Sequence, residues 1–245
     1  MGSRRFLLVL GILVFIAGLV VSLPARVAVA LISQPGIAVS GVSGSVWKGT
    51  AEEASVAGIY LRDLKWDASI LPMFTGKLAY RIEATPVSGF VETDLRIGLD
   101  RTIYLSDFAA AMPLQILAGV QNAQALGGNA SAQFERVEIV GDLAVAADGV
   151  IQVADLVMPE VARDSIGSYR ADFNTQNNGI VASIEDTDGI LDLAGSLQIR
   201  TDRTYQFLAQ VILTSKTPAA VRQQIQRLPP PNARGQYELR EEGQF

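Results

Sequence analysis

Carboxylates are the main groups in this sequence that could do acid–base chemistry, because the chain of 245 residues contains neither histidine nor cysteine. Their absence removes the Ser-His-Asp triad, the thiolate nucleophile and most zinc sites. Histidine is also the most frequent proton-transfer residue of enzymes. The composition therefore favours a protein that is not an enzyme, and we expect no catalytic residue, no cofactor and no metal site.

The densest group of acids is Glu185, Asp186 and Asp188, followed by Gly189. A calcium loop of the EF-hand type that began at Asp186 would need a glutamate at its twelfth position, where this chain has Leu197. An aspartic-protease site would need a second copy of the motif, which the sequence lacks. Asp-Gly is instead typical of a β-hairpin turn, and we interpret this segment as one.

Other residues with chemical potential also have a simpler interpretation. Glu52–Glu53 and Glu241–Glu242 are adjacent pairs. Neighbouring residues of a strand point to opposite faces, so neither pair can flank one glycosidic bond, and we expect all four to be solvated. Trp47 and Trp66 could form a ligand platform, but aromatic residues on strands more often serve packing. Asn129-Ala130-Ser131 matches a glycosylation sequon, a common chance match outside eukaryotic secretion.

An uncharged apolar stretch from Phe6 to Leu23 decides where the rest of the chain lies. As a helix its eighteen residues would be about 27 Å long, close to the thickness of a bilayer core. Arg4 and Arg5 precede it, which predicts a cytoplasmic N-terminus and a body across the membrane. The alternative is a secretory signal cleaved after Ala28-Val29-Ala30, but the stretch exceeds the usual apolar length of about 7–15 residues.

These features divide the chain into three parts. Residues 1–5 form a cytoplasmic N-terminus, residues 6–32 a transmembrane anchor with a juxtamembrane segment, and residues 33–245 a β-rich domain outside the cytoplasm. The net charge of −5 and the pI near 4.9 argue against binding to nucleic acid, since no basic stripe is present.

The body has the pattern of an antiparallel sheet. Apolar and polar residues alternate strictly from Val91 to Asp100 and from Leu191 to Arg200, which predicts strands with one dry face. Asp148-Gly149, Asn178-Gly179 and Asp188-Gly189 favour hairpin turns between consecutive strands. We therefore expect a mainly β fold, a curved antiparallel meander that can form an open trough.

Two local exceptions interrupt the strands. A change of face between Ile59 and Trp66 predicts a bulge near Arg62-Asp63. One or two short helices are expected, over Met112–Val120 and from Thr217, a suitable N-cap before Pro218, to Leu228. The apolar face of such a sheet must be covered by a second sheet, a helix or lipid, and an open edge can bind another strand.

Several short motifs occur in an order that resembles the type II secretion system protein N family. After the anchor these are Gly44-Ser45-Val46-Trp47-Lys48-Gly49, Leu64-Lys65-Trp66, Pro72 with Gly76-Lys77-Leu78, Gly127-Gly128 and Gly235-Gln236-Tyr237-Glu238-Leu239. In many relatives an Asp-Gly turn stands where this chain has Ala233-Arg234-Gly235.

The resemblance implies a single-pass inner-membrane protein of a Gram-negative bacterium with a periplasmic β-rich domain. Its implied role is that of a non-enzymatic accessory component of type II secretion, with other secretion proteins as partners. The domain is also similar in fold to AsmA-like proteins, which implies an alternative function as a lipid-binding or lipid-transfer module with phospholipid as the ligand.

Overall fold

The computed structural model describes residues 6, 10–12, 15, 18–19, 21–31, 36–56, 58–69, 72, 77–119 and 126–244. Much of the predicted anchor, residues 6–23, lies outside these ranges. Within them, no helix has both the length and the apolar character needed to cross a bilayer. The anchor and the three-part division of the chain stay predictions.

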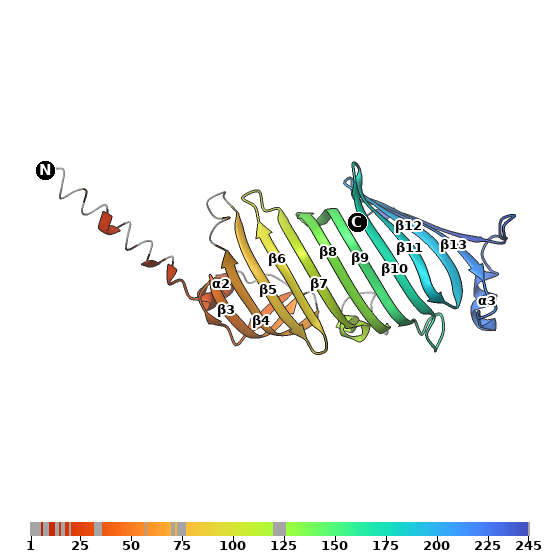
Figure 1. The fold of residues 1–245 in the computed structure, drawn as a ribbon, viewed down its shortest axis with the longest axis horizontal. Helices are drawn as coiled ribbons and strands as arrows, with labels where there is room; N and C mark the ends of the chain where they lie inside the picture. Colours follow the sequence, from red (N-terminus) through yellow and green to blue (C-terminus); the bar gives the residue numbers. More distant parts are fainter. Residues whose placement is uncertain are drawn as a thin grey trace.

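The described body is one antiparallel sheet of fourteen strands. Figure 1 shows the strands side by side in chain order, which confirms the predicted meander; β2 is off this path and pairs only with β3. The strands are β1 (Ile37–Ser40), β2 (Ser43–Gly44), β3 (Lys48–Val56), β4 (Ile59–Ser69), β5 (Leu78–Pro86), β6 (Phe90–Ile97), β7 (Ile103–Pro113), β8 (Gly127–Val140), β9 (Leu143–Val157), β10 (Gly167–Gln176), β11 (Gly179–Gly189), β12 (Leu191–Arg200), β13 (Thr204–Leu213) and β14 (Tyr237–Gln244).

Three short helices accompany the sheet in the described ranges: α2 (Ala25–Leu31), the 3-10 helix η2 (Leu114–Gly119) and α3 (Ala219–Ile225). The helix expected over Met112–Val120 was partly wrong, because Met112 and Pro113 still pair with β8 at the end of β7. In α3 the N-cap is Pro218. Thr217 does not cap it, since the Thr217 hydroxyl donates to the carbonyl oxygen of Ile190 at 2.6 Å.

Of the three predicted turns, two lie at ends of strands and one is wrong. Asn177 and Asn178 form the turn between β10 and β11, so the prediction at Asn178-Gly179 is displaced by one residue. Asp188-Gly189 pairs with β10 and ends β11 before β12. Asp148-Gly149 instead lies inside β9. The Asp148 carboxylate is bound by Arg136 and by the backbone N–H of Thr175, so an Asp-Gly pair that suits a turn is held in the middle of the sheet.

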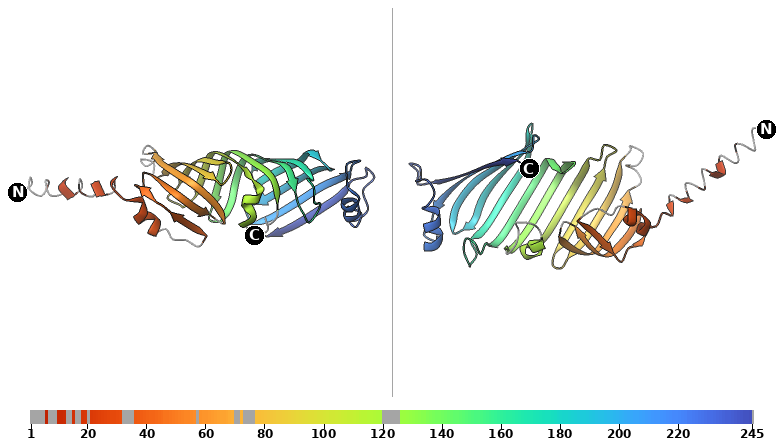
Figure 2. Two further views of the ribbon diagram at one scale, coloured as in Figure 1. Left: turned by 90° about the horizontal axis from the view of Figure 1, so that it is seen from below. Right: turned by 180° about the vertical axis from the view of Figure 1, so that it is seen from behind.

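Aspartates at positive φ interrupt three strands and shift their register. Asp63, Asp107 and Asp155 have φ of 49°, 50° and 51°, and the pairing of each strand shifts beside them. The bulge predicted near Arg62-Asp63 is thereby confirmed. The short polar side chain of aspartate tolerates this conformation, and bulges increase the local twist and bend of a strand. Figure 2 shows the sheet curved, with η2 on its hollow side.

One face of the sheet carries an unbroken apolar row that crosses ten strands from β5 to β14. Its members pair in register, and we call them the apolar row: Ala84, Val91, Ala110, Ala132, Ile151, Ala171, Ile184, Gly195, Ala209 and Leu239. Six of these ten are alanine or glycine. Larger residues flank the row two positions away on several strands; on one side these include Phe108, Phe134, Phe173, Leu197 and Phe207.

The opposite face is polar and carries a row of alternating charge. It runs from β3 to β9 through Lys48, Asp67, Arg81, Asp94, Ser106, Arg136 and Asp148. Ion pairs join Lys48 to Asp67 at 2.6 Å, Arg81 to Asp94 at 2.9 Å and Arg136 to Asp148 at 2.8 Å. Exposed pairs of this kind contribute about 0.2–1 kcal/mol each. Their main consequence is that this face stays in contact with water.

Aromatic rings lie over glycines of the neighbouring strand at three places on the apolar face. A Cβ on Gly149 would come within 2.6 Å of Cδ1 of Phe134, and one on Gly243 within 2.5 Å of Cε1 of Tyr205. The Trp66 ring covers Gly49 in the same way, and its indole N–H donates to the carbonyl oxygen of Ser45 at 3.0 Å. The packing interpretation therefore fits Trp66.

We expect Gly149→Ala to lower the free energy of unfolding by about 1–3 kcal/mol, because the methyl group would displace the Phe134 ring and press on the backbone of β8. Phe134 in turn contacts Phe108 and Phe173, with ring centroids 6.3 and 5.4 Å apart. Urea unfolding of the full chain in detergent measures the effect. Ser196→Ala, at an exposed position of β12, is the control and should change stability by less than about 0.5 kcal/mol. Equal midpoints for both variants would contradict the role of Gly149.

Candidate functional site

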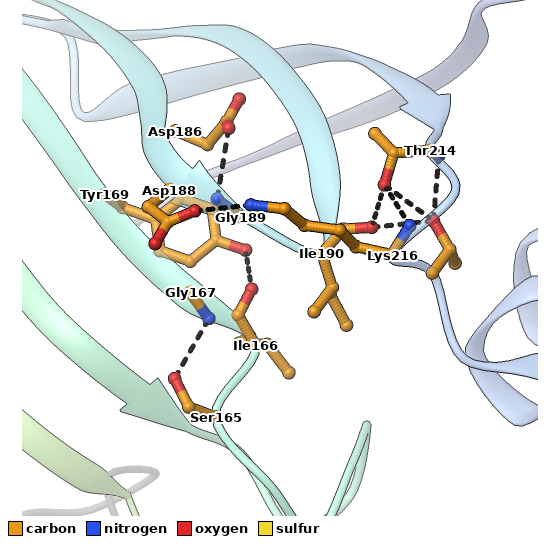
Figure 3. A network of polar contacts seen from close by, with 11 residues as sticks. Ser165, Ile166, Gly167, Tyr169, Asp186, Asp188, Gly189, Ile190, Thr214 and Lys216 are labelled. Carbon is orange, nitrogen blue, oxygen red and sulfur yellow. Dashed lines mark hydrogen bonds and ion pairs between the residues drawn. The ribbon is translucent and has the colours of Figure 1, made fainter.

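The acidic group at the end of β11 is the strongest candidate site from the sequence, and Figure 3 shows how its side chains lie. The Asp186 carboxylate accepts hydrogen bonds from the backbone N–H of Gly189 at 3.3 Å and of Leu193 at 2.7 Å. These two bonds use one oxygen each. The carboxylate therefore closes the connection from β11 to β12, which agrees with the turn interpretation.

Asp188 points to a different partner, the ammonium group of Lys216. Their atoms Oδ1 and Nζ are 2.7 Å apart, and both side chains are exposed. The hydrogen bond and charge of Lys216 lower the pKa of Asp188, and those of Asp188 raise the pKa of Lys216. The pair links the β11–β12 turn to the segment between β13 and α3.

Neutral groups complete this network (Figure 3). The hydroxyls of Thr214 and Thr217 both donate to the carbonyl oxygen of Ile190, at 2.9 and 2.6 Å. The Tyr169 hydroxyl donates to the carbonyl oxygen of Ile166 at 3.1 Å, and burial followed by the charge of Asp186 raises the pKa of Tyr169. Each of these polar groups thus binds a backbone or ionic partner. Together they form a structural tie between the segment before β10, the β11–β12 connection and the segment between β13 and α3.

The adjacent glutamates are exposed, as predicted for solvated pairs. Glu53 accepts a long hydrogen bond from Ser40, and Glu241 accepts one from Tyr205 at 3.3 Å. Glu242 is bound by Arg240 and Gln206, whose hydrogen bonds lower its pKa. In the described ranges, no group of three or more metal-ligating side chains occurs, and no buried side-chain N or O atom lacks a partner.

The sequence did not indicate the hollows on the surface of the domain. One hollow, with a volume of about 710 Å³, lies between α2 and β1. A smaller one of about 290 Å³ lies on the polar face among Lys65, Arg81 and Glu83. Both depend on segments that meet only in the folded chain, so no local pattern signals them.

We expect Asp186→Ala to lower the free energy of unfolding by about 1–3 kcal/mol, because two half-buried backbone N–H groups lose their acceptor. Asp188→Asn is the matched control two residues away. It removes an exposed ion pair and should cost less than about 1 kcal/mol. Urea unfolding at pH 7 compares the two. A larger loss for Asp188→Asn would show that the tie depends on Lys216 and not on the Asp186 carboxylate.

Comparisons with known proteins show the family to which the chain belongs. The model of the type II secretion system protein N family matches residues 35–240. The type II secretion system protein N of Vibrio cholerae is 25% identical over 250 residues, which cover 95% of each chain. No solved structure matches the chain. Because the family model spans most of the sequence, the chain belongs to the type II secretion system protein N family.

Proposed function

We propose that the protein is a non-enzymatic accessory component of the bacterial type II secretion system that works through contacts with other envelope proteins. The observation that carries this proposal is the family match over residues 35–240, which implies a role in type II protein secretion. The absence of histidine and cysteine supports a role without catalysis. So does the use of the Asp186 carboxylate as a backbone acceptor.

The location in the envelope is part of the same proposal. The apolar stretch from Phe6 to Leu23 and the two arginines before it support a single-pass anchor in the inner membrane, with residues 33–245 in the periplasm. The described body begins directly after this stretch, with α2 and β1. In this arrangement the first strands of the sheet lie closest to the membrane surface.

The contact proposal is tested by isolating the tagged full chain from bacterial membranes in a mild detergent. We expect mass spectrometry to recover other type II secretion subunits, and to recover none of them with an equally tagged single-pass periplasmic protein of unrelated function. Deletion of the gene should also reduce export of a folded secreted protein. Normal export together with isolation of the chain alone would contradict the proposal.

The proposed topology is tested by cysteine labelling, which is simple because the chain has no cysteine of its own. Ser196→Cys, on the exposed polar face of β12, should react with a membrane-impermeant maleimide in spheroplasts. Ser3→Cys should react only after the membrane is lysed. Labelling in the reverse pattern would place the sheet in the cytoplasm and overturn the assigned location.

A second function, phospholipid binding, is favoured by the apolar row. Most large side chains that flank it, such as Phe134, Phe173 and Phe207, are half-exposed. At about 4.8 Å between strands the row is about 43 Å long, which exceeds the hydrocarbon core of about 30 Å in a bilayer. The row offers acyl chains an apolar surface, because its side chains are apolar and the backbone groups of its paired strands are hydrogen-bonded within the sheet.

Lipid binding is tested by native mass spectrometry of the full chain purified in detergent from membranes. Ala171→Glu places a charge in the middle of the apolar row, and we expect it to remove phospholipid adducts that the unaltered chain retains. Ser196→Glu, on the polar face, is the control and should keep them. Circular dichroism checks that both variants fold. An unaltered chain without adducts, or equal adducts in both variants, would exclude this function.

A further inference from the structure

The two outer edges of the described sheet differ in charge. The edge strand β14 carries four charged residues, Glu238, Arg240, Glu241 and Glu242, and all are exposed. Charged side chains on an edge are a common protection against pairing with another strand. The other edge strand, β1, has the sequence Ile-Ala-Val-Ser without a charge, and three of its four residues are exposed. The edge that contains β1 is therefore the unprotected one of the two.

A groove runs along this unprotected edge, between β1 and α2. It is the hollow of about 710 Å³, and its lining consists of Arg26, Val29 and Ala30 from α2 together with residues 37–42. Figure 2 shows α2 beside the first strands at the N-terminal end of the sheet. A groove between an edge strand and a helix is a setting in which an extended peptide adds to a sheet as a further strand.

Backbone contacts hold α2 in place beside the sheet. The backbone N–H of Val46 donates to the carbonyl oxygen of Leu23 at 3.0 Å, and Pro24 pairs with Ser45 in an isolated bridge. Ala25, at the start of α2, is buried. The groove thus has two fixed walls, one from the helix and one from the strand.

The shape and charge of the groove restrict what can occupy it. An added strand would lie about 4.8 Å from β1, in the hollow between β1 and α2. Arg26 is exposed and forms no ion pair within the described ranges. Its guanidinium would bind a carboxylate with two parallel hydrogen bonds.

We infer that the groove between β1 and α2 binds one extended, membrane-proximal segment of another secretion protein, with apolar side chains and a carboxylate that pairs with Arg26. The inference rests on the proposed function, because it names how the chain contacts a partner in the secretion machinery. Affinity comes from backbone hydrogen bonds to the free edge of β1. Selectivity comes from the apolar lining and from Arg26.

The probes for the test are synthetic peptides that tile the membrane-proximal extramembrane segments of the type II secretion subunits of the same bacterium. Fluorescence anisotropy measures their binding to the full chain in detergent. Hydrogen exchange locates the site. We expect at least one acidic peptide to bind and to slow exchange at residues 37–42. Peptides that bind without slowing exchange there would overturn the inference.

Substitutions at Arg26 test the charge. Arg26→Glu should weaken binding of that peptide about fivefold or more, and Arg26→Lys less than about threefold, as expected for an exposed ion pair. Arg163→Glu, at another exposed arginine, is the control and should have no effect. Equal affinity of the Arg26→Glu and Arg163→Glu variants would remove Arg26 from the site.

Proline substitutions test the added strand. Neighbouring residues of β1 direct their N–H groups alternately toward β3 and away from it. Of Ala38→Pro and Val39→Pro, one should therefore weaken peptide binding at an unchanged unfolding temperature, and the other should lower that temperature. Undiminished binding by both variants would overturn strand addition.

The groove and the proposed function can fail separately. If secretion subunits are isolated with the full chain but no tiled peptide slows exchange at residues 37–42, the groove assignment falls and the proposed function stands. If peptides from unrelated envelope proteins bind the groove while no secretion subunit is isolated, strand addition at β1 stands and the proposed function falls.

Discussion

The hydrogen-bond ladder between consecutive strands is the interaction on which the described structure depends. In the described ranges no second sheet covers either face, so each strand is shielded mainly by its neighbours in the same layer. Small side chains are buried most completely in this way: Ala51, Ala182 and Ala209 are each 1% exposed. Most larger apolar residues of the same face stay half-exposed, with Ile180 and Val211, each 2% exposed, as exceptions. Cross-strand pairs therefore take the place of a conventional core.

Local irregularities shape this single layer. Asp63, Asp107 and Asp155 adopt positive φ and shift the register of long strands, which bends them. The rings of Trp66 and Phe134 cover glycines on the adjacent strand and shield backbone that has no side chain of its own. The bulges and the ring–glycine pairs together allow a sheet of this length to curve without a second layer.

The polar groups that a sequence search would select for chemistry are used for structure. The Asp186 carboxylate binds two backbone amides, and Asp148 binds Arg136 and the backbone of β10. The described part of the molecule exposes three kinds of surface: an apolar face, a face of paired charges and one uncharged edge beside a helix. Such surfaces are suited to binding, which fits the family's implied role in type II protein secretion.

The sequence by itself determined the β class and the meander, because alternation and turn residues are local signals. It also indicated the approximate places of the two short helices η2 and α3. It also excluded the common catalytic arrangements, since composition alone removes histidine and cysteine. The motif order was enough to indicate the family. One bulge, at Asp63, could be predicted because the residues that face the apolar side change parity within a single strand.

Only the tertiary structure decided the register of the strands, and with it the apolar row, the charge row and the groove beside β1. These features depend on which residues of neighbouring strands lie opposite one another. The sequence of a single strand does not specify its register with the neighbouring strand. Gly149 illustrates the difference. Asp148-Gly149 has the local signature of a turn, yet Arg136, Thr175 and the ring of Phe134, all from other strands, hold it in the middle of β9.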